Sequence, residues 1–199
     1  MATNMSIQPK DAAEIHDMFF RATASERALI LHNLAQTPLK AAPRIPAARA
    51  RRAIETLEMA AFAADAENFA LEIGESLILP ARVAAQIVDD PSGEALAVAA
   101  RALDMPSPVF QRILLFFKEE IGTSVTAVYR LSRLYDRLSD RSALVMLAAW
   151  RGSTLAVTRA KYQSSLYDGE RQRARTASNQ PRPGLQPSTV RTGTDRSNG

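Results

Sequence analysis

The chain of 199 residues contains no cysteine, which excludes disulfide bonds, zinc sites built on thiolates and cysteine nucleophiles. Histidine is nearly absent too: His16 and His32 fall on separate predicted helices, without a second metal ligand at a typical spacing. We find no phosphate-binding glycine loop, nucleophile elbow or HExxH motif. We therefore expect no catalytic, metal or cofactor site and predict that the protein is not an enzyme. An enzyme with an unrecognised carboxylate or arginine site is the remaining alternative.

Long hydrophobic runs are also missing. The longest charge-free apolar stretch covers about residues 143–150, well short of the roughly 20 residues that a membrane-spanning helix needs. Charged residues interrupt the first 20 residues, which do not resemble a signal peptide. The lack of cysteine fits a reducing compartment. We expect a soluble cytoplasmic protein without membrane contact.

Lysine is scarce, with only four among the 25 basic residues, and the net charge is +4. From Asp168 onward there are six arginines and three acidic residues, so most of the net charge belongs to the C-terminal end. A GC-rich genome also favours arginine, so this composition alone is weak support for nucleic-acid binding.

What the sequence has in abundance is alanine, and its apolar residues lack the period-two alternation of strands, so it predicts helices. The expected helical ranges are 11–22, 24–35, 47–64, 66–78, 81–88, 92–103, 107–121, 124–138 and 140–151, with a further helix suggested over 153–166. Thr23 and Glu26 predict a capping box for the second helix. Asp90-Pro91 and Ser107-Pro108 each predict a cap followed by a proline in the first turn. Gly122 predicts a helix end.

We expect residues 1–167 to form one all-α domain, an antiparallel stack of helices resembling HEAT repeats or a solenoid. No sharp sequence repeat supports the solenoid part of this prediction. Residues 168–199 are rich in Arg, Pro, Ser, Thr and Gly and have few large apolar residues. We expect them to be a disordered tail.

The segment "FQRILLFFKEE" (residues 110–120) raises the question of whether its apolar side chains are core or contact surface. On a helical wheel, one wide face collects Val109, Phe110, Ile113, Leu114, Phe116 and Phe117. Such a face is typical of a core-facing helix. Leu115 falls among polar residues, and we expect it to pack under a neighbouring helix or, alternatively, to contact a partner. Leu115 and the Phe116–Phe117 pair could also join two copies of the chain.

The helix predicted over residues 124–138 has two distinct faces. Its apolar residues are Val125, Val128, Leu131, Leu134, Tyr135 and Leu138. Within about 60° on the other side lie Arg130, Arg133 and Arg137. Like charges at this spacing repel one another unless something compensates them. Either this stripe contacts an acidic protein surface or nucleic-acid phosphates, or its arginines pair with acids on a neighbouring helix.

A second basic cluster surrounds the start of the helix predicted from residue 47. It comprises Arg44, Arg49, Arg51 and Arg52. Cations at a helix N-terminus oppose the helix dipole, and Arg51 and Arg52 can reach Glu55 only in the less favourable order. A phosphate or carboxylate ligand would suit this cluster. The alternative is an ordinary solvated helix start.

Two segments resemble a known family. "GEALAVAARALDMPSPVFQRILLFFKEEIGTSVTAVYRLSRLYD" (residues 93–136) resembles the conserved segment of the alphaproteobacterial domain of unknown function 2336, and "FFRATASERALILHNLA" (residues 19–35) is similar to its opening. The resemblance covers about residues 10–152. It implies an all-helical fold, built from HEAT-like helix pairs, and it supplies no catalytic residues.

From these observations we expect a non-enzymatic helical module that binds a protein partner, with the stripe of Arg130, Arg133 and Arg137 as the contact. Helical stacks suit such a role because they present extended surfaces. The alternative is a nucleic-acid-binding protein that uses the stripe and the basic tail.

Overall fold

The computed structural model describes the backbone of residues 9–153 and the side chains of residues 11–153. Every regular element in this part of the chain is an α-helix, which confirms the predicted all-helical fold. The last described helical segment covers residues 140–153. The helices before it are α1 (Pro9–Arg21), α2 (Ala24–Gln36), α3 (Ala47–Phe62), α4 (Ala66–Leu77), α5 (Ala81–Asp89), α6 (Glu94–Ala102), α7 (Ser107–Phe117), α8 (Glu119–Gly122) and α9 (Val125–Arg137).

The capping box predicted for α2 is present. The Thr23 hydroxyl accepts a hydrogen bond from the Glu26 amide, and the Glu26 carboxylate accepts one from the Thr23 amide at 2.8 Å. Asp65 caps α4 in a similar way, by accepting a hydrogen bond from the Asn68 amide at 3.0 Å. The cap predicted at Ser107 is wrong, because this residue lies in the first turn of α7 and no side chain caps that helix.

The predicted start of α6 is also wrong. The helix begins at Glu94 after a turn, in which Gly93 adopts the left-handed conformation (φ 81°) that favours glycine. Asp90 ends α5, and its carboxylate is held mainly by the side chain of Arg27. The need to place this carboxylate beside Arg27 overrides the cap-plus-proline pattern that the sequence indicated.

The helix predicted over residues 107–121 is interrupted at Lys118, whose extended backbone (φ −115°, ψ 91°) separates α7 from α8. The Lys118 ammonium donates a hydrogen bond to the backbone oxygen of Asp90 at 2.8 Å. The short α8 lies against the backbone of α7, since a Cβ atom at Gly122 would be only 2.4 Å from the carbonyl oxygen of Leu115. Gly122 is therefore required for this close approach, and not for ending one long helix.

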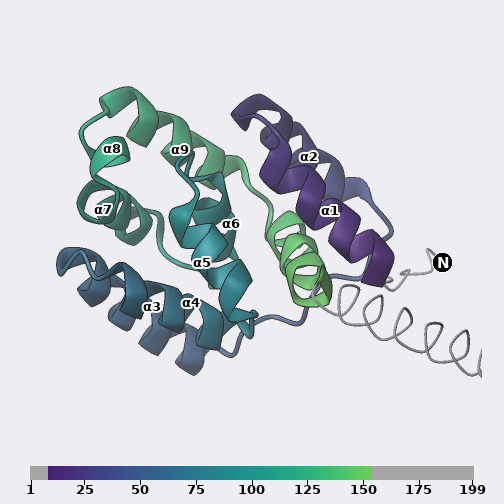
Figure 1. Cartoon of the computed structure of the whole chain (residues 1–199), viewed down its shortest axis with the longest axis horizontal. Coiled ribbons are helices and arrows are strands. Elements are labelled where there is room, and N and C mark those ends of the chain that lie inside the picture. Colours follow the sequence, from purple (N-terminus) through teal and green to yellow (C-terminus); the bar gives the residue numbers. More distant parts are fainter. Residues whose placement is uncertain (1–8, 154–199) are drawn as a thin grey trace, which may run out of the picture. The chain divides into compact units, whose positions relative to one another are not determined.

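The helix at the centre of the described part is α6, with eight of its nine side chains buried. In Figure 1 the α1–α2 pair lies on one side of α5 and α6, and the α3–α4 pair lies on the other. The helix α9 packs on α6, α7 and α8. Trp150 is fully buried, with its ring 6.1 Å from that of Phe19 and 6.2 Å from that of Phe20. These contacts join α1 to the last described helical segment.

Two apolar side chains that the sequence placed on the apolar faces of their helices are exposed, namely Phe116 (57 %) and Val125 (85 %). The buried residues of α2 are Arg27, Leu31 and Leu34, whereas Leu29 is 62 % exposed. The side chain of Phe116 packs edge-to-face on that of Phe62 at the surface, whereas Phe110, Ile113 and Leu114 of α7 are buried as predicted.

The helix suggested for residues 153–166 and the tail predicted over residues 168–199 lie outside the described residues, which end at 153. Among the described helices, none has the length and apolar character needed to cross a membrane.

Candidate functional site

The helix α9 carries the arginine stripe, defined as Arg130, Arg133 and Arg137. The other face of α9 sets its rotation, because Leu131 and Tyr135 are buried and the Tyr135 hydroxyl donates a hydrogen bond to the backbone oxygen of Met105. With that face against the core, all three arginines line a groove between α2 and α9. The two helices lie next to each other in Figure 1.

This α2–α9 groove has a volume of about 700 Å³. Its apolar lining consists of Ala24, Ala28, Leu31, Ala35, Leu134 and Leu138, together with the ring of Tyr129. The remaining polar groups around it belong to Ser25, His32, Ser139 and Ser142. No carboxylate is among the lining residues, so the arginines give the groove a positive charge beside an apolar surface.

Arg130 pairs with groups of the protein itself. It forms an ion pair with the fully buried carboxylate of Glu94 on α6, and it donates a hydrogen bond to the backbone oxygen of Ser92 at 2.9 Å. For this residue, the structure agrees with the interpretation that the stripe pairs with acids on a neighbouring helix.

Arg133 and Arg137 are different. Both are exposed, and neither forms an ion pair within the side chains that the structure describes. The Arg133 guanidinium lies 5.6 Å from the centre of the Tyr129 ring, a cation–π contact that leaves its hydrogen-bond donors available. These two residues carry the uncompensated charge of the groove.

A buried ion-pair network lies beside the groove. Arg27 of α2 binds the carboxylate of Asp90 at 2.8 Å and that of Glu94 at 3.4 Å, and it is only 5 % exposed. With Arg130, the network contains two cations and two anions, which is the balance that burial of charge requires. Because Glu94 binds Arg27 of α2 and Arg130 of α9, it holds the two walls of the groove relative to each other.

The second basic cluster does not form one site. Arg44 pairs with Asp140 at 2.6 Å. Arg49 donates to the backbone oxygen of Glu75 in the last turn of α4, where a cation complements the helix dipole. These two residues therefore stabilise the fold. The hydrogen bond from Arg44 is the main cause of the lowered pKa of Asp140.

Arg51 and Arg52 are exposed at the start of α3, and the pairing with Glu55 that the sequence allowed is absent. They line different surface hollows, Arg51 one that Asp140 also lines and Arg52 one that Glu72 also lines. Arg44 lines the first of these hollows and Arg49 the second, so the structure divides the cluster between two places, and a role in anion binding stays a prediction for Arg51 and Arg52.

Leu115 does not pack under a neighbouring helix as expected, because its side chain is 48 % exposed. The break at Lys118 directs α8 onto the backbone of Leu115 and leaves the side chain uncovered. Phe117 is half-buried and stacks on Phe69 at 4.1 Å. A contact of Leu115 or Phe116 with a partner or a second copy stays a prediction.

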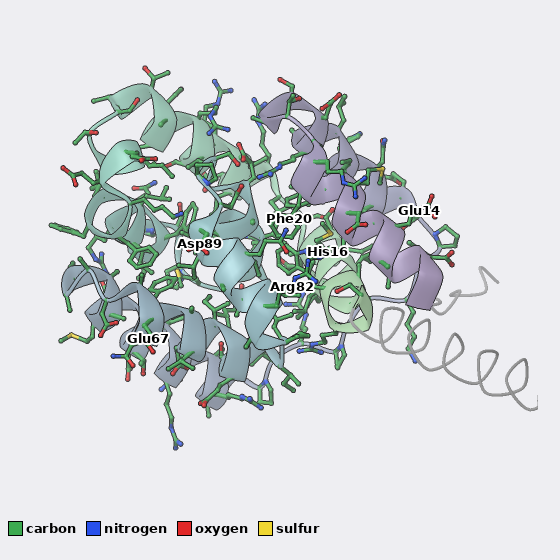
Figure 2. The ribbon with its side chains drawn as sticks, in the orientation of Figure 1. Glu14, His16, Phe20, Glu67, Arg82 and Asp89 are labelled. Atoms are coloured by element: carbon green, nitrogen blue, oxygen red, sulfur yellow. The ribbon has the colours of Figure 1, made fainter. Side chains whose placement is uncertain are left out.

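The two histidines are separate. His16 of α1 lies beside Phe20 and toward Arg82 of α5 (Figure 2), and its Nδ1 has no hydrogen-bond partner among the described residues. Burial is the main cause that lowers the pKa of His16, and Arg82 adds to it, while Asp17 opposes it. His32 lines the α2–α9 groove. Within residues 11–153, no group of three or more potential metal ligands comes together.

The sequence pattern did not reveal the α2 wall of the groove, Tyr129 or the network around Arg27. One signal was present: Arg27, Leu31 and Leu34 recur at the spacing of a buried helix face. A cation on such a face indicates a buried acidic partner. The two acids that pair with Arg27 lie more than 60 residues away in the sequence.

These features define an all-helical protein with a groove that is basic on one wall and partly apolar. The chain matches the family DUF2336, described as an uncharacterised protein conserved in bacteria, over residues 6–148, and it belongs to that family. The comparisons with curated proteins and with solved structures gave no significant match.

Proposed function

We propose that this protein is a non-enzymatic helical interaction module of the bacterial cytoplasm, with HEAT-like stacking of its helices. It binds a segment of a partner protein in the α2–α9 groove. The observation that carries this proposal is the composition of the groove, which places two uncompensated guanidinium groups, Arg133 and Arg137, beside an apolar surface. A protein segment with acidic and apolar side chains can pair with the two guanidinium groups and cover the apolar surface.

The ion pairs that connect the two walls of the groove also support a binding role. Glu94 binds Arg27 of α2 and Arg130 of α9, so the groove is formed in the absence of a partner. A site that is already formed loses less conformational entropy on binding than one that must be assembled.

Nucleic acid is the competing ligand, since phosphates would also pair with Arg133 and Arg137. A phosphate backbone would leave the alanine and leucine side chains of the groove without an apolar contact. For this reason we favour a protein partner, and the test below includes nucleic acid as an outcome.

The proposal is tested by affinity capture from a lysate of the source bacterium, with and without nuclease treatment. The full chain is compared with the double variant Arg133→Glu/Arg137→Glu. We expect the full chain to retain a discrete protein after nuclease treatment and the variant to lose it. Arg130 is left unchanged because its pairing with Glu94 belongs to the fold.

The matched control is Arg51→Glu/Arg52→Glu, which makes the same change in charge at two exposed arginines of α3. Both positions are exposed, and substitutions at such positions usually change stability by no more than about 0.5 kcal/mol, so this control is not expected to destabilise the protein. It should retain the partner. A partner captured equally by both double variants, or one whose capture ends with nuclease treatment, contradicts the proposal.

A further inference from the structure

We infer that the occupant of the α2–α9 groove is an amphipathic helix of the partner protein, with carboxylates along one edge at a spacing of i and i+4. This inference deepens the proposed function and rests on it. Three observations carry it: the length of the apolar lining, the backbone of the two walls and the spacing of the uncompensated arginines.

The apolar lining follows one face of α2 from Ala24 to Ala35. At a rise of 1.5 Å per residue this is a length of about 16 Å, or three helical turns. Three of the four apolar α2 residues along it are alanines, whose small side chains allow another helix to approach closely. A partner helix of three to four turns can therefore bury one apolar face along the whole groove.

The walls favour a helix over an extended peptide. Both α2 and α9 satisfy their backbone amides and carbonyls internally, so the groove offers no free strand edge. An extended peptide lying on the apolar lining would leave its own backbone groups without partners, which is costly. A helical occupant satisfies these groups itself.

The two uncompensated arginines of the groove determine the spacing of the carboxylates on the partner helix. Arg133 and Arg137 are four residues apart on α9, which separates them by about 6 Å along the helix axis. Two carboxylates at i and i+4 on a partner helix have the same separation, so both pairs can form at once. Because Arg130 is already paired with Glu94, a third carboxylate is not required.

The experiment measures binding of fluorescent 16-residue synthetic peptides to the full chain by anisotropy. The first peptide is an amphipathic helix with leucine and alanine on one face and glutamates at i and i+4 along one edge. The second has the same composition in scrambled order, the third has a central proline, and the fourth has lysines in place of the edge glutamates. A duplex DNA of random sequence is the nucleic-acid probe.

We expect the first peptide to bind at least about tenfold more tightly than the scrambled and proline peptides. Arg133→Glu/Arg137→Glu should weaken its binding by about tenfold or more and should improve binding of the lysine peptide. Arg51→Glu/Arg52→Glu should leave both affinities unchanged. The exchange of peptide preference is a result that a misfolded variant would not give.

Equal affinity for the amphipathic, scrambled and proline peptides, or absence of binding by all of them, overturns the inference of a helical occupant. So does tighter binding of the DNA. Failure here is distinguishable from failure of the proposed function, because capture of a natural partner that depends on Arg133 and Arg137 would still establish the groove as a protein-binding site.

Discussion

At the scale of single residues, Arg27 is the side chain on which most of the interior charge depends. It contacts Asp90, Ser92 and Glu94, donates to the backbone oxygens of three residues near the end of α1, and lies over the ring of Phe19 at 5.0 Å. Without it, the buried carboxylate of Asp90 would lose its ion pair and that of Glu94 would lose one of its two cations.

Replacing Arg27 with alanine is therefore expected to lower the free energy of unfolding by about 3–5 kcal/mol, the typical effect of leaving a buried charge without its partner. The control is Arg52→Ala, at an exposed position of α3, where a change within about 0.5 kcal/mol is expected. Urea unfolding followed by circular dichroism measures both. Similar values for the two variants would show that the network does not stabilise the fold.

A second prediction at this scale concerns pH. Because the folded protein keeps the pKa of His16 below its ordinary value of 6.5, the unfolded chain takes up a proton first as the pH falls. The contribution of neutral His16 to stability is fully present above about pH 6.5 and is lost as the pH falls from there toward the pKa of His16 in the folded state. His16→Gln should remove this loss below about pH 6.5. Urea unfolding at several pH values tests it, and equal pH dependence in both proteins would contradict it.

Within the arginine stripe, charge reversal of Arg130 and of Arg133 is expected to have different effects on stability. Arg130→Glu places a carboxylate beside the buried Glu94 and should destabilise the protein by about 1–3 kcal/mol, a moderate cost because the side chain of Arg130 is 42 % exposed and Glu94 keeps Arg27. Arg133→Glu should change stability by no more than about 0.5 kcal/mol. Thermal unfolding of the two single variants and of the unchanged protein measures both changes in stability. An equal loss in both would show that Arg133 is also part of the folded interior.

At the scale of elements, the break between α7 and α8 is the feature that the sequence pattern predicted least well. The apolar periodicity of residues 109–117 correctly indicated the core face at Phe110, Ile113 and Leu114. The helix ends at Lys118 because its ammonium contacts the backbone oxygen of Asp90, a residue 28 positions earlier in the chain. Contacts of this kind are not visible in local periodicity.

Gly122 gives the clearest test of how α8 packs. In Gly122→Ala the new methyl group would meet the backbone of Leu115 at 2.4 Å, and backbone cannot rotate away, so we expect a loss of about 1–3 kcal/mol. Gly74→Ala in α4 is the matched control. Its methyl group would meet the Cβ atom of Ala84 at 3.4 Å, and the better helix propensity of alanine should leave it neutral or stabilising by about 0.5–1 kcal/mol. The order of the two unfolding midpoints checks the prediction, and the reverse order would contradict it.

At the scale of the whole molecule, the sequence was sufficient for the fold class and for one wall of the candidate site. Alanine-rich periodic segments indicated the helices, and the stripe was visible because Arg130, Arg133 and Arg137 share a face of one helix. The groove was not predictable, because its other wall, α2, is about a hundred residues away in sequence. The division of the stripe into one paired and two uncompensated arginines likewise depends on Glu94, which lies on a different helix.

The central claim is that a partner protein occupies the α2–α9 groove, and photocrosslinking tests it most directly. The crosslinking residue p-benzoylphenylalanine replaces Tyr129, an aromatic side chain in the groove that is 62 % exposed. The same residue at Phe62, which is 49 % exposed and outside the groove, is the control. Cells are irradiated and their lysate is then treated with nuclease. We expect a discrete protein adduct from position 129. This adduct should be absent from position 62 and lost in the Arg133→Glu/Arg137→Glu background. An adduct of equal yield at both positions, or one that survives the charge reversal, would contradict the assignment of the groove as the binding site.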